Sequence, residues 1–126
     1  MNPSSRHRSP RSPSPIPILP RTIGVVTSLD GAALRDVLKV LRRRFAGVSI
    51  MVAPTAVQGP GAPGEIVAAL RAIDARALDA LLIVRGGGAR EDLAAFDDEA
   101  VVRAVAACRT PTVSGVGHEI DTTLVD

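Results

Sequence analysis

The sequence predicts an α/β domain built on an open, doubly wound and mostly parallel sheet. Short apolar runs alternate with longer segments whose apolar residues recur at helical spacing, in the order β-α-β-α-β-α-β. The apolar runs are continuous rather than alternating, as expected where helices cover both faces of a parallel sheet. Right-handed crossovers then give a three-layer α/β/α arrangement of the Rossmann-like or flavodoxin-like type.

The first half of the chain supplies two predicted strands and one predicted helix. The run TIGVVT at 22–27 is rich in β-branched residues, which favours a strand. Residues 32–45 follow as a helix, and VSIMVA at 48–53 is the second strand. Residues 54–64 contain several prolines and glycines, which predicts a loop. The apolar stripe of the helix consists of Leu34, Val37, Leu38, Leu41 and Phe45.

The second half repeats the alternation of helix and strand. Residues 65–76 form a second amphipathic segment, and DALLIV at 79–84 is the third strand. The helix predicted at 97–108 begins with acidic residues, which the helix dipole favours in a first turn. The run PTVSGV at 111–116 is the fourth strand.

Composition and charge exclude several classes of protein. The chain has 126 residues, of which 46% are hydrophobic, and this suits one domain with a real core. The single cysteine, Cys108, excludes an internal disulfide and a cysteine-rich zinc site and fits a reducing, cytoplasmic compartment. The 2% of aromatic residues offer no platform for stacking bases. No apolar run approaches the length of about 20 residues that spans a bilayer.

The basic character of the chain is concentrated at its amino terminus. Residues 1–21 carry four of the 15 basic residues and no acid, which leaves 11 basic and 13 acidic residues in the remainder. Net charge therefore does not identify the domain as a DNA-binding one. Residues 1–20 are rich in proline, serine and arginine, and we expect a disordered leader and linker there.

Polar residues and glycines follow each predicted strand. Because ligands of open parallel sheets bind beyond the carboxyl ends of the strands, this edge is the predicted site. The first three strands are followed by the candidates for phosphate or DNA binding, which are Thr27, Ser28, Gln58, Gly86, Gly87 and Gly88. The fourth is followed by the sequence GHEID at 117–121.

The three glycines come directly after Arg85. A tight turn is the simplest explanation of such a run, although a turn needs only one or two glycines. The spacing matches neither a dinucleotide-binding G-x-G-x-x-G sequence nor a P-loop. An arginine can bind two phosphate oxygens, and a helix starting near residues 90–91 would direct free N–H groups into the loop. The stretch therefore favours a phosphate site.

His118, Asp121 and Asp36 are the other candidates. Histidine exchanges a proton near neutral pH, as acid–base catalysis requires, and Asp121 would share a helical face with His118. The alternatives are a surface histidine beside an acid and a metal site with few ligands. Asp36 points away from the apolar stripe, so a solvated charge near Lys39 is its simplest interpretation. The arginines at 42–44 also suggest a solvated face.

Four stretches resemble the nuclease domain of the exodeoxyribonuclease VII large subunit family. They are IGVVTSLDGAALRDVLKVLRRRF, PTAVQGPGAPGEIVAAL, LLIVRGGGAREDLAAFDDE and PTVSGVGHEIDTTLVD, and the resemblance runs from about Pro15 to Asp126. The resemblance implies hydrolysis of phosphodiester bonds in single-stranded DNA from either end, which releases oligonucleotides. It assigns catalytic roles to Asp36, Arg85, His118 and Asp121. It implies no required cofactor, with Mg²⁺ as an option that Asp36 or Asp121 could hold.

The sequence departs from the family pattern in two ways. The family usually has G-R-G-G-G-S, whereas Val84 and Ala89 stand at the two ends of that motif here. We expect residues 21–126 to be a nuclease domain that is incomplete at its carboxyl end. The family's plan also includes an amino-terminal OB-type DNA-binding domain and a helical region that recruits small subunits, and we expect both to be missing from these 126 residues. An inactive fragment, or a non-catalytic domain that binds phosphate or nucleotides, is therefore the alternative to the enzyme.

Overall fold

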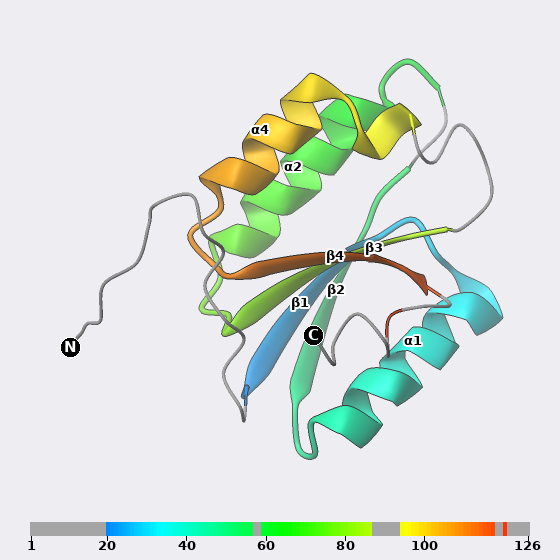
Figure 1. Ribbon diagram of the computed structural model, residues 1–126, viewed down its shortest axis with the longest axis vertical. Helices are drawn as coiled ribbons and strands as arrows, with labels where there is room; N and C mark the ends of the chain where they lie inside the picture. The colour runs from blue at the N-terminus through cyan, green and yellow to red at the C-terminus, as the bar shows by residue number, and fades with distance from the viewer. Residues whose placement is uncertain (1–19, 57–58, 87–93, 118–119, 121–126) are drawn as a thin grey trace.

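The computed structural model of the protein describes residues 20–56, 59–86, 94–117 and 120. Strands and helices alternate along the chain as the sequence predicts (Figure 1). The elements are β1 (Thr22–Thr27), α1 (Gly31–Arg44), β2 (Ser49–Pro54), α2 (Ala62–Asp74), β3 (Ala80–Arg85), α4 (Glu99–Ala107) and β4 (Thr112–Val116). None of the helices in these ranges is both long enough and apolar enough to cross a membrane.

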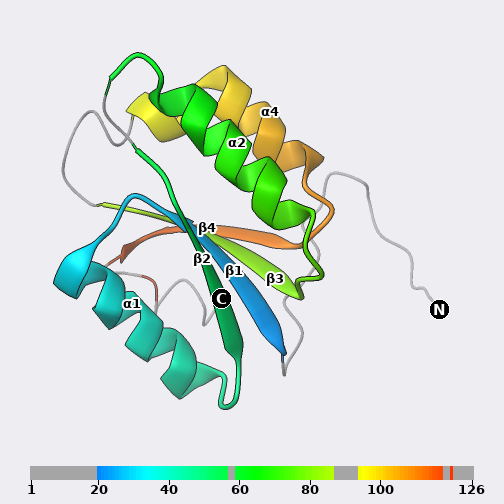
Figure 2. The same cartoon turned by 180° about the vertical axis from the view of Figure 1, so that it is seen from behind.

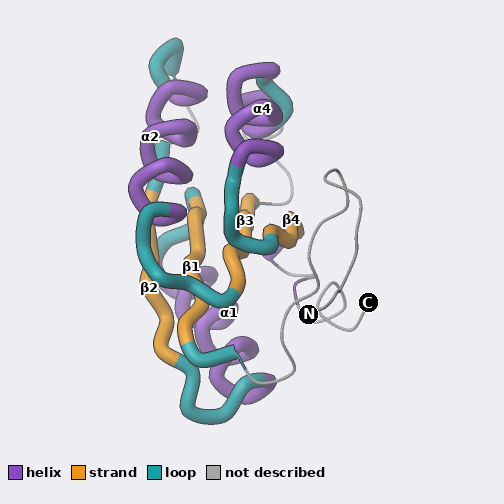
Figure 3. The backbone as a smooth tube through the Cα atoms, turned by 90° about the vertical axis from the view of Figure 1, so that its left-hand side faces the viewer, coloured by secondary structure: helices purple, strands orange, loops and turns teal. Residues whose placement is uncertain are grey.

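The four strands form one parallel sheet in the order β2-β1-β3-β4. The chain moves outward from β1 to β2 and then returns to the other side of β1, so the direction of winding reverses between β1 and β3. Helix α1 lies on one face of the sheet, whereas α2 and α4 lie side by side on the other (Figures 2 and 3). The predicted doubly wound, three-layer α/β/α fold is therefore confirmed.

The hydrophobic core is divided between the two faces of the sheet. Leu81 and Ile83 of β3 pack with α2 and α4, while the alternate residues Leu82 and Val84 pack with α1. All four are at most 4% exposed. Strand β3 is therefore buried on both sides, which explains why its sequence is a continuous apolar run.

Three details differ from the sequence prediction. Helix α2 starts at Ala62 rather than at residue 65, because Pro63 fits the first turn, where no N–H is needed. Strand β2 is an edge strand that leaves Val52 37% exposed, so its run of apolar residues is not covered on both sides. In α1 the fully buried residues are Val37 and Leu41, while the other members of the predicted stripe are half-buried.

Two aspartates tie the amino-terminal edge of the sheet together. The Asp79 carboxylate accepts hydrogen bonds from the backbone N–H groups of Arg21 and Thr22, at 2.7 and 3.1 Å. The Asp74 carboxylate at the end of α2 accepts from the N–H groups of Arg109 and Thr110, both at 3.1 Å. These bonds fix where β1 and β4 begin.

Replacing Gly24 by alanine is expected to destabilise the fold. A Cβ at this position of β1 would lie 2.7 Å from Leu78 Cδ1 and 2.8 Å from Ile73 Cδ1. Such overpacking costs about 1–3 kcal/mol of unfolding free energy. The matched control is Gly64→Ala in α2, where nothing lies within 4 Å, and a gain of up to about 1 kcal/mol is expected. Urea unfolding of both variants tests this, and an unchanged midpoint for Gly24→Ala would contradict the packing.

The hydrogen bonds of Asp74 predict a dependence of stability on pH. Burial raises the pKa of Asp74, but the hydrogen bonds from Arg109 and Thr110 and the charge of Arg109 outweigh it, so the net pKa is lowered. A lowered folded-state pKa contributes stability above the unfolded value of about 3.9, and this stability is lost as the pH falls through the folded value.

We therefore expect Asp74→Asn to reduce the free energy of unfolding by about 1 kcal/mol at neutral pH. The loss should shrink toward zero when unfolding is measured below the folded-state pKa. Asp30→Asn is the control, because Asp30 makes no side-chain capping bond. An Asp74→Asn effect that is the same at neutral and acidic pH would disprove the proposed role of its charge.

Candidate active site

The switch in winding direction brings the ends of β1 and β3 together at one edge of the sheet. Thr27 at the end of β1 pairs with Val84, and Arg85 at the end of β3 pairs with Val116 of β4. Ser28 and Gly86 follow directly, and both are partly exposed. Helix α1 starts at this same edge (Figure 1). In doubly wound sheets this is the position where ligands bind.

A third segment reaches this point after β4. A Cβ placed on Gly117 would lie 2.8 Å from Leu29 Cδ1 and 3.8 Å from the carbonyl oxygen of Arg85. The loops that follow β1, β3 and β4 therefore converge, and Gly117 allows the close approach. The next residue in the sequence is His118, which lies outside the described residues together with Gln58, Gly87, Gly88 and Asp121.

One further residue of this part of the chain is described, and it packs in the core. Ile120 is 1% exposed and belongs to the core cluster that contains Val37 and Leu41 of α1. Gly117 and Ile120 thus each contact a described part of the fold. Sequence analysis assigned no role to Ile120, although an apolar residue between two polar ones is a usable signal.

Arg85 is partly buried, and its guanidinium has an unusual environment. Its Nη1 atom is closed to solvent and has no hydrogen-bond partner among the described residues. Buried N–H groups are nearly always paired, and leaving one unpaired costs about 1–3 kcal/mol. The arrangement is therefore one that an anionic ligand, or a small rearrangement around Arg85, would complete.

The amino terminus of α1 is also available to an anion. Its N-cap residue, Asp30, makes no side-chain capping bond, and the first turn contains no acidic residue. Gly31 has a φ of 53°, a left-handed conformation that favours glycine, and nothing lies within 4 Å of where its Cβ would be. The free N–H groups and the dipole of this helix end favour negative charge.

Thr27 and Asp36 occupy different environments. Thr27 is 0% exposed, and its Oγ1 accepts a hydrogen bond from the Leu29 N–H at 2.9 Å. Its carbonyl oxygen accepts from the Thr55 N–H, also at 2.9 Å. Through these two hydrogen bonds, Thr27 stabilises the conformation of the loop after β1. Asp36, in the second turn of α1, is exposed, as its outward direction on the predicted helix indicated.

The described residues do not by themselves assemble a metal centre. No group of three or more histidine, cysteine, aspartate or glutamate side chains gathers within the ranges that the structure describes. Because His118 and Asp121 lie outside those ranges, this finding leaves the option of Mg²⁺ untested.

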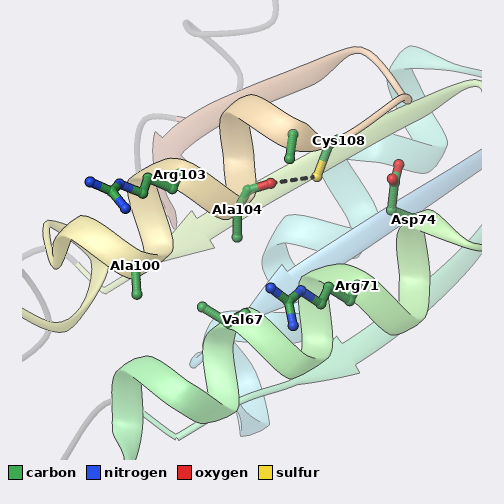
Figure 4. Close-up of a pocket in the computed structure, with 8 residues that line it drawn as sticks. Val67, Arg71, Asp74, Ala100, Arg103, Ala104 and Cys108 are labelled. Atoms are coloured by element: carbon green, nitrogen blue, oxygen red, sulfur yellow. Dashed lines mark hydrogen bonds between the residues drawn. The ribbon is translucent and has the colours of Figure 1, made fainter.

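A hollow lies between α2 and α4 (Figure 4). It has a volume of about 410 Å³ and contains Arg71, Asp74, Arg103 and Cys108 in its lining. Burial, followed by the negative charge of Asp74, raises the pKa of the Cys108 thiol to about 11. Its Sγ donates to the Ala104 carbonyl at 3.4 Å. Cys108 is therefore protonated at neutral pH and is no nucleophile.

The fold and the converging loops define a doubly wound α/β domain with a candidate anion site at the switch between β1 and β3. The sequence model of the family described as exonuclease VII, large subunit, matches residues 9–126. The chain therefore belongs to the exonuclease VII large subunit family.

Individual relatives agree with this assignment. The exodeoxyribonuclease 7 large subunit of Thiobacillus denitrificans is 59% identical over 112 residues, which are 88% of this chain and 25% of that protein. The protein of the same name from Geotalea uraniireducens is 53% identical over 113 residues, or 89% of this chain and 25% of its own length. The chain thus spans about a quarter of the length of these curated relatives.

Proposed function

We propose that this domain hydrolyses phosphodiester bonds of single-stranded DNA, as the catalytic domain of an exonuclease VII large subunit. The observation that carries the proposal is the position of Arg85, a permanent cation at the end of β3, where the segments after β1 and β4 also meet. Membership of the family supports the reaction class, and the position of Arg85 supports binding of a phosphate. Release of oligonucleotides from either end of the strand belongs to this proposal.

Each site residue has a role in the proposed reaction. Arg85, the amide of Gly86 and the amino terminus of α1 hold the scissile phosphate and stabilise the charge that develops on it. His118 protonates the leaving oxygen or activates water, and Asp121 orients its ring. Asp36 positions the water. Ser28, Gln58, Gly87 and Gly88 contact the neighbouring DNA backbone.

The proposed mechanism needs no bound metal. The positive charge of Arg85 and the proton of His118 supply what a cation and a metal-bound water would otherwise provide. If Mg²⁺ takes part, Asp36 or Asp121 is the carboxylate that holds it. The relatives' name implies an assembly of large and small subunits for the whole proteins. We propose that this chain acts within such an assembly on single-stranded DNA in the cytoplasm.

Arg85→Ala is expected to weaken binding of a single-stranded oligodeoxynucleotide by about 10- to 100-fold, because a hydrogen-bonded charge contact contributes about 1.5–3 kcal/mol. The measurement is fluorescence anisotropy, followed by a cleavage assay with the same labelled strand. Arg76→Ala is the matched control, since it removes the same charge from an exposed position between α2 and β3, at the opposite edge of the sheet. Equal effects of the two substitutions would refute the proposed phosphate site.

The cleavage assay also separates the enzyme from its alternative. Loss of cleavage in Arg85→Ala and His118→Ala, with cleavage by the unsubstituted chain persisting in EDTA, is the expected result. Tight binding of nucleotides without any cleavage would instead support a non-catalytic phosphate-binding domain. Full cleavage by His118→Ala would remove that residue from the mechanism.

A further inference from the structure

A small pocket lies beside Arg85 on the face of the sheet that α2 and α4 cover. It has a volume of about 140 Å³. Its lining consists of Ile83, Arg85, Phe96, Asp97, Val101, Val105 and Ser114. Within that lining, Asp97 and Ser114 are the side chains that can accept a hydrogen bond from a guanidinium. Neither of them was a candidate in the sequence analysis.

The register of the sheet explains why Ser114 and Arg85 share this pocket. Ser114 pairs with Ile83, and Arg85 follows Ile83 by two residues. Since side chains alternate between the faces of a strand, all three leave the sheet on the same side. Ile83 packs in the core cluster that also contains Phe96 and Val101, which fixes that side as the one covered by α2 and α4.

The aspartate next to the pocket is free to interact, unlike its neighbour. Asp98 is the N-cap of α4, and its Oδ1 accepts a hydrogen bond from the Ala100 N–H at 2.8 Å. Asp97 makes no hydrogen bond or ion pair with any residue in the described ranges, and it is exposed. Asp98 is therefore engaged in capping α4, whereas the Asp97 carboxylate is available to another partner.

The guanidinium needs an acceptor on its protein side. Its planar fork presents N–H groups on more than one edge, and a bound phosphate uses one edge. The Nη1 atom is closed to solvent, so water does not satisfy it, and it lacks a partner among the described residues. A charged donor that stays unpaired when the phosphate binds would weaken the site that it serves.

We propose that Ser114 and Asp97 are positioning residues that hold the inner edge of the Arg85 guanidinium while its outer edge binds the DNA phosphate. A rotation of the Ser114 side chain within the shared pocket would let its hydroxyl accept a hydrogen bond from the guanidinium, and the Asp97 carboxylate attracts the charge of Arg85. Both residues thus act through Arg85 and not on the substrate. The inference rests on the proposed function, because it assigns the outer edge to a phosphate.

A double-mutant cycle on oligodeoxynucleotide binding tests the proposal. Ser114→Ala and Asp97→Ala are each expected to weaken binding by about tenfold in the Arg85 protein and by no measurable factor in the Arg85→Met background, which lacks both the charge and the donors of the guanidinium. Ser114→Thr, which keeps the hydroxyl, should restore binding. Thr112→Ala is the matched control, because Thr112 lies on the same strand and the same face but does not line the pocket. Equal losses in both backgrounds would overturn the proposal.

A second readout does not depend on DNA or on activity. Nitrogen-15 NMR measures the rate at which the Arg85 guanidinium rotates about its Cζ–Nε bond, and hydrogen bonds to the inner edge slow that rotation. With inorganic phosphate present, rotation should be faster in Ser114→Ala and Asp97→Ala than in the unsubstituted chain and in Thr112→Ala. Unchanged rotation in both variants would overturn the positioning role. The two proposals can fail separately. If Arg85→Ala binds DNA normally while the Arg85 guanidinium still rotates faster in Ser114→Ala and Asp97→Ala, the proposed function fails and the positioning role stands.

Discussion

The parallel pairing of β1 with β3 is the interaction on which both the core and the candidate site depend. Its register places Val84 beside Thr27, so the two strands end at the same level. The same ladder sends Leu82 toward α1 and Ile83 toward α2 and α4, which divides the core between the faces. A slip of one residue would turn Arg85 to the α1 side and exchange the residues of β3 that face the two halves of the core.

The candidate site lies across this edge rather than on one face. Asp36 and the contact at Ile120 belong to the α1 side, whereas Arg85 leaves β3 on the side of α2 and α4. Gly117 and Leu29 meet between them at the ends of the strands. A polymer can pass over such an edge with a phosphate between the two sides, which suits the proposed substrate better than a closed pocket would.

Periodicity predicts most of this fold because buried strands and amphipathic helices carry strong signals. The patterns place β1 correctly. They miss the start of α2, because the proline and glycine in its first turn are also typical of a loop. Position at the end of a strand predicts Arg85 as a candidate site residue. It does not reveal the roles of Asp97, Ser114 or Gly117, because these depend on which strands are neighbours and on which face each side chain leaves the sheet.

The proposed function requires a DNA phosphate to bind at the edge where β1 and β3 end. Backbone amide shifts in ¹H–¹⁵N spectra, followed during titration with a short single-stranded oligodeoxynucleotide, test it most directly. We expect changes at Ser28, Gly31 and Gly86, and none at the opposite edge around Asp79. Changes confined to the hollow between α2 and α4, or to the surroundings of Asp79, would contradict it.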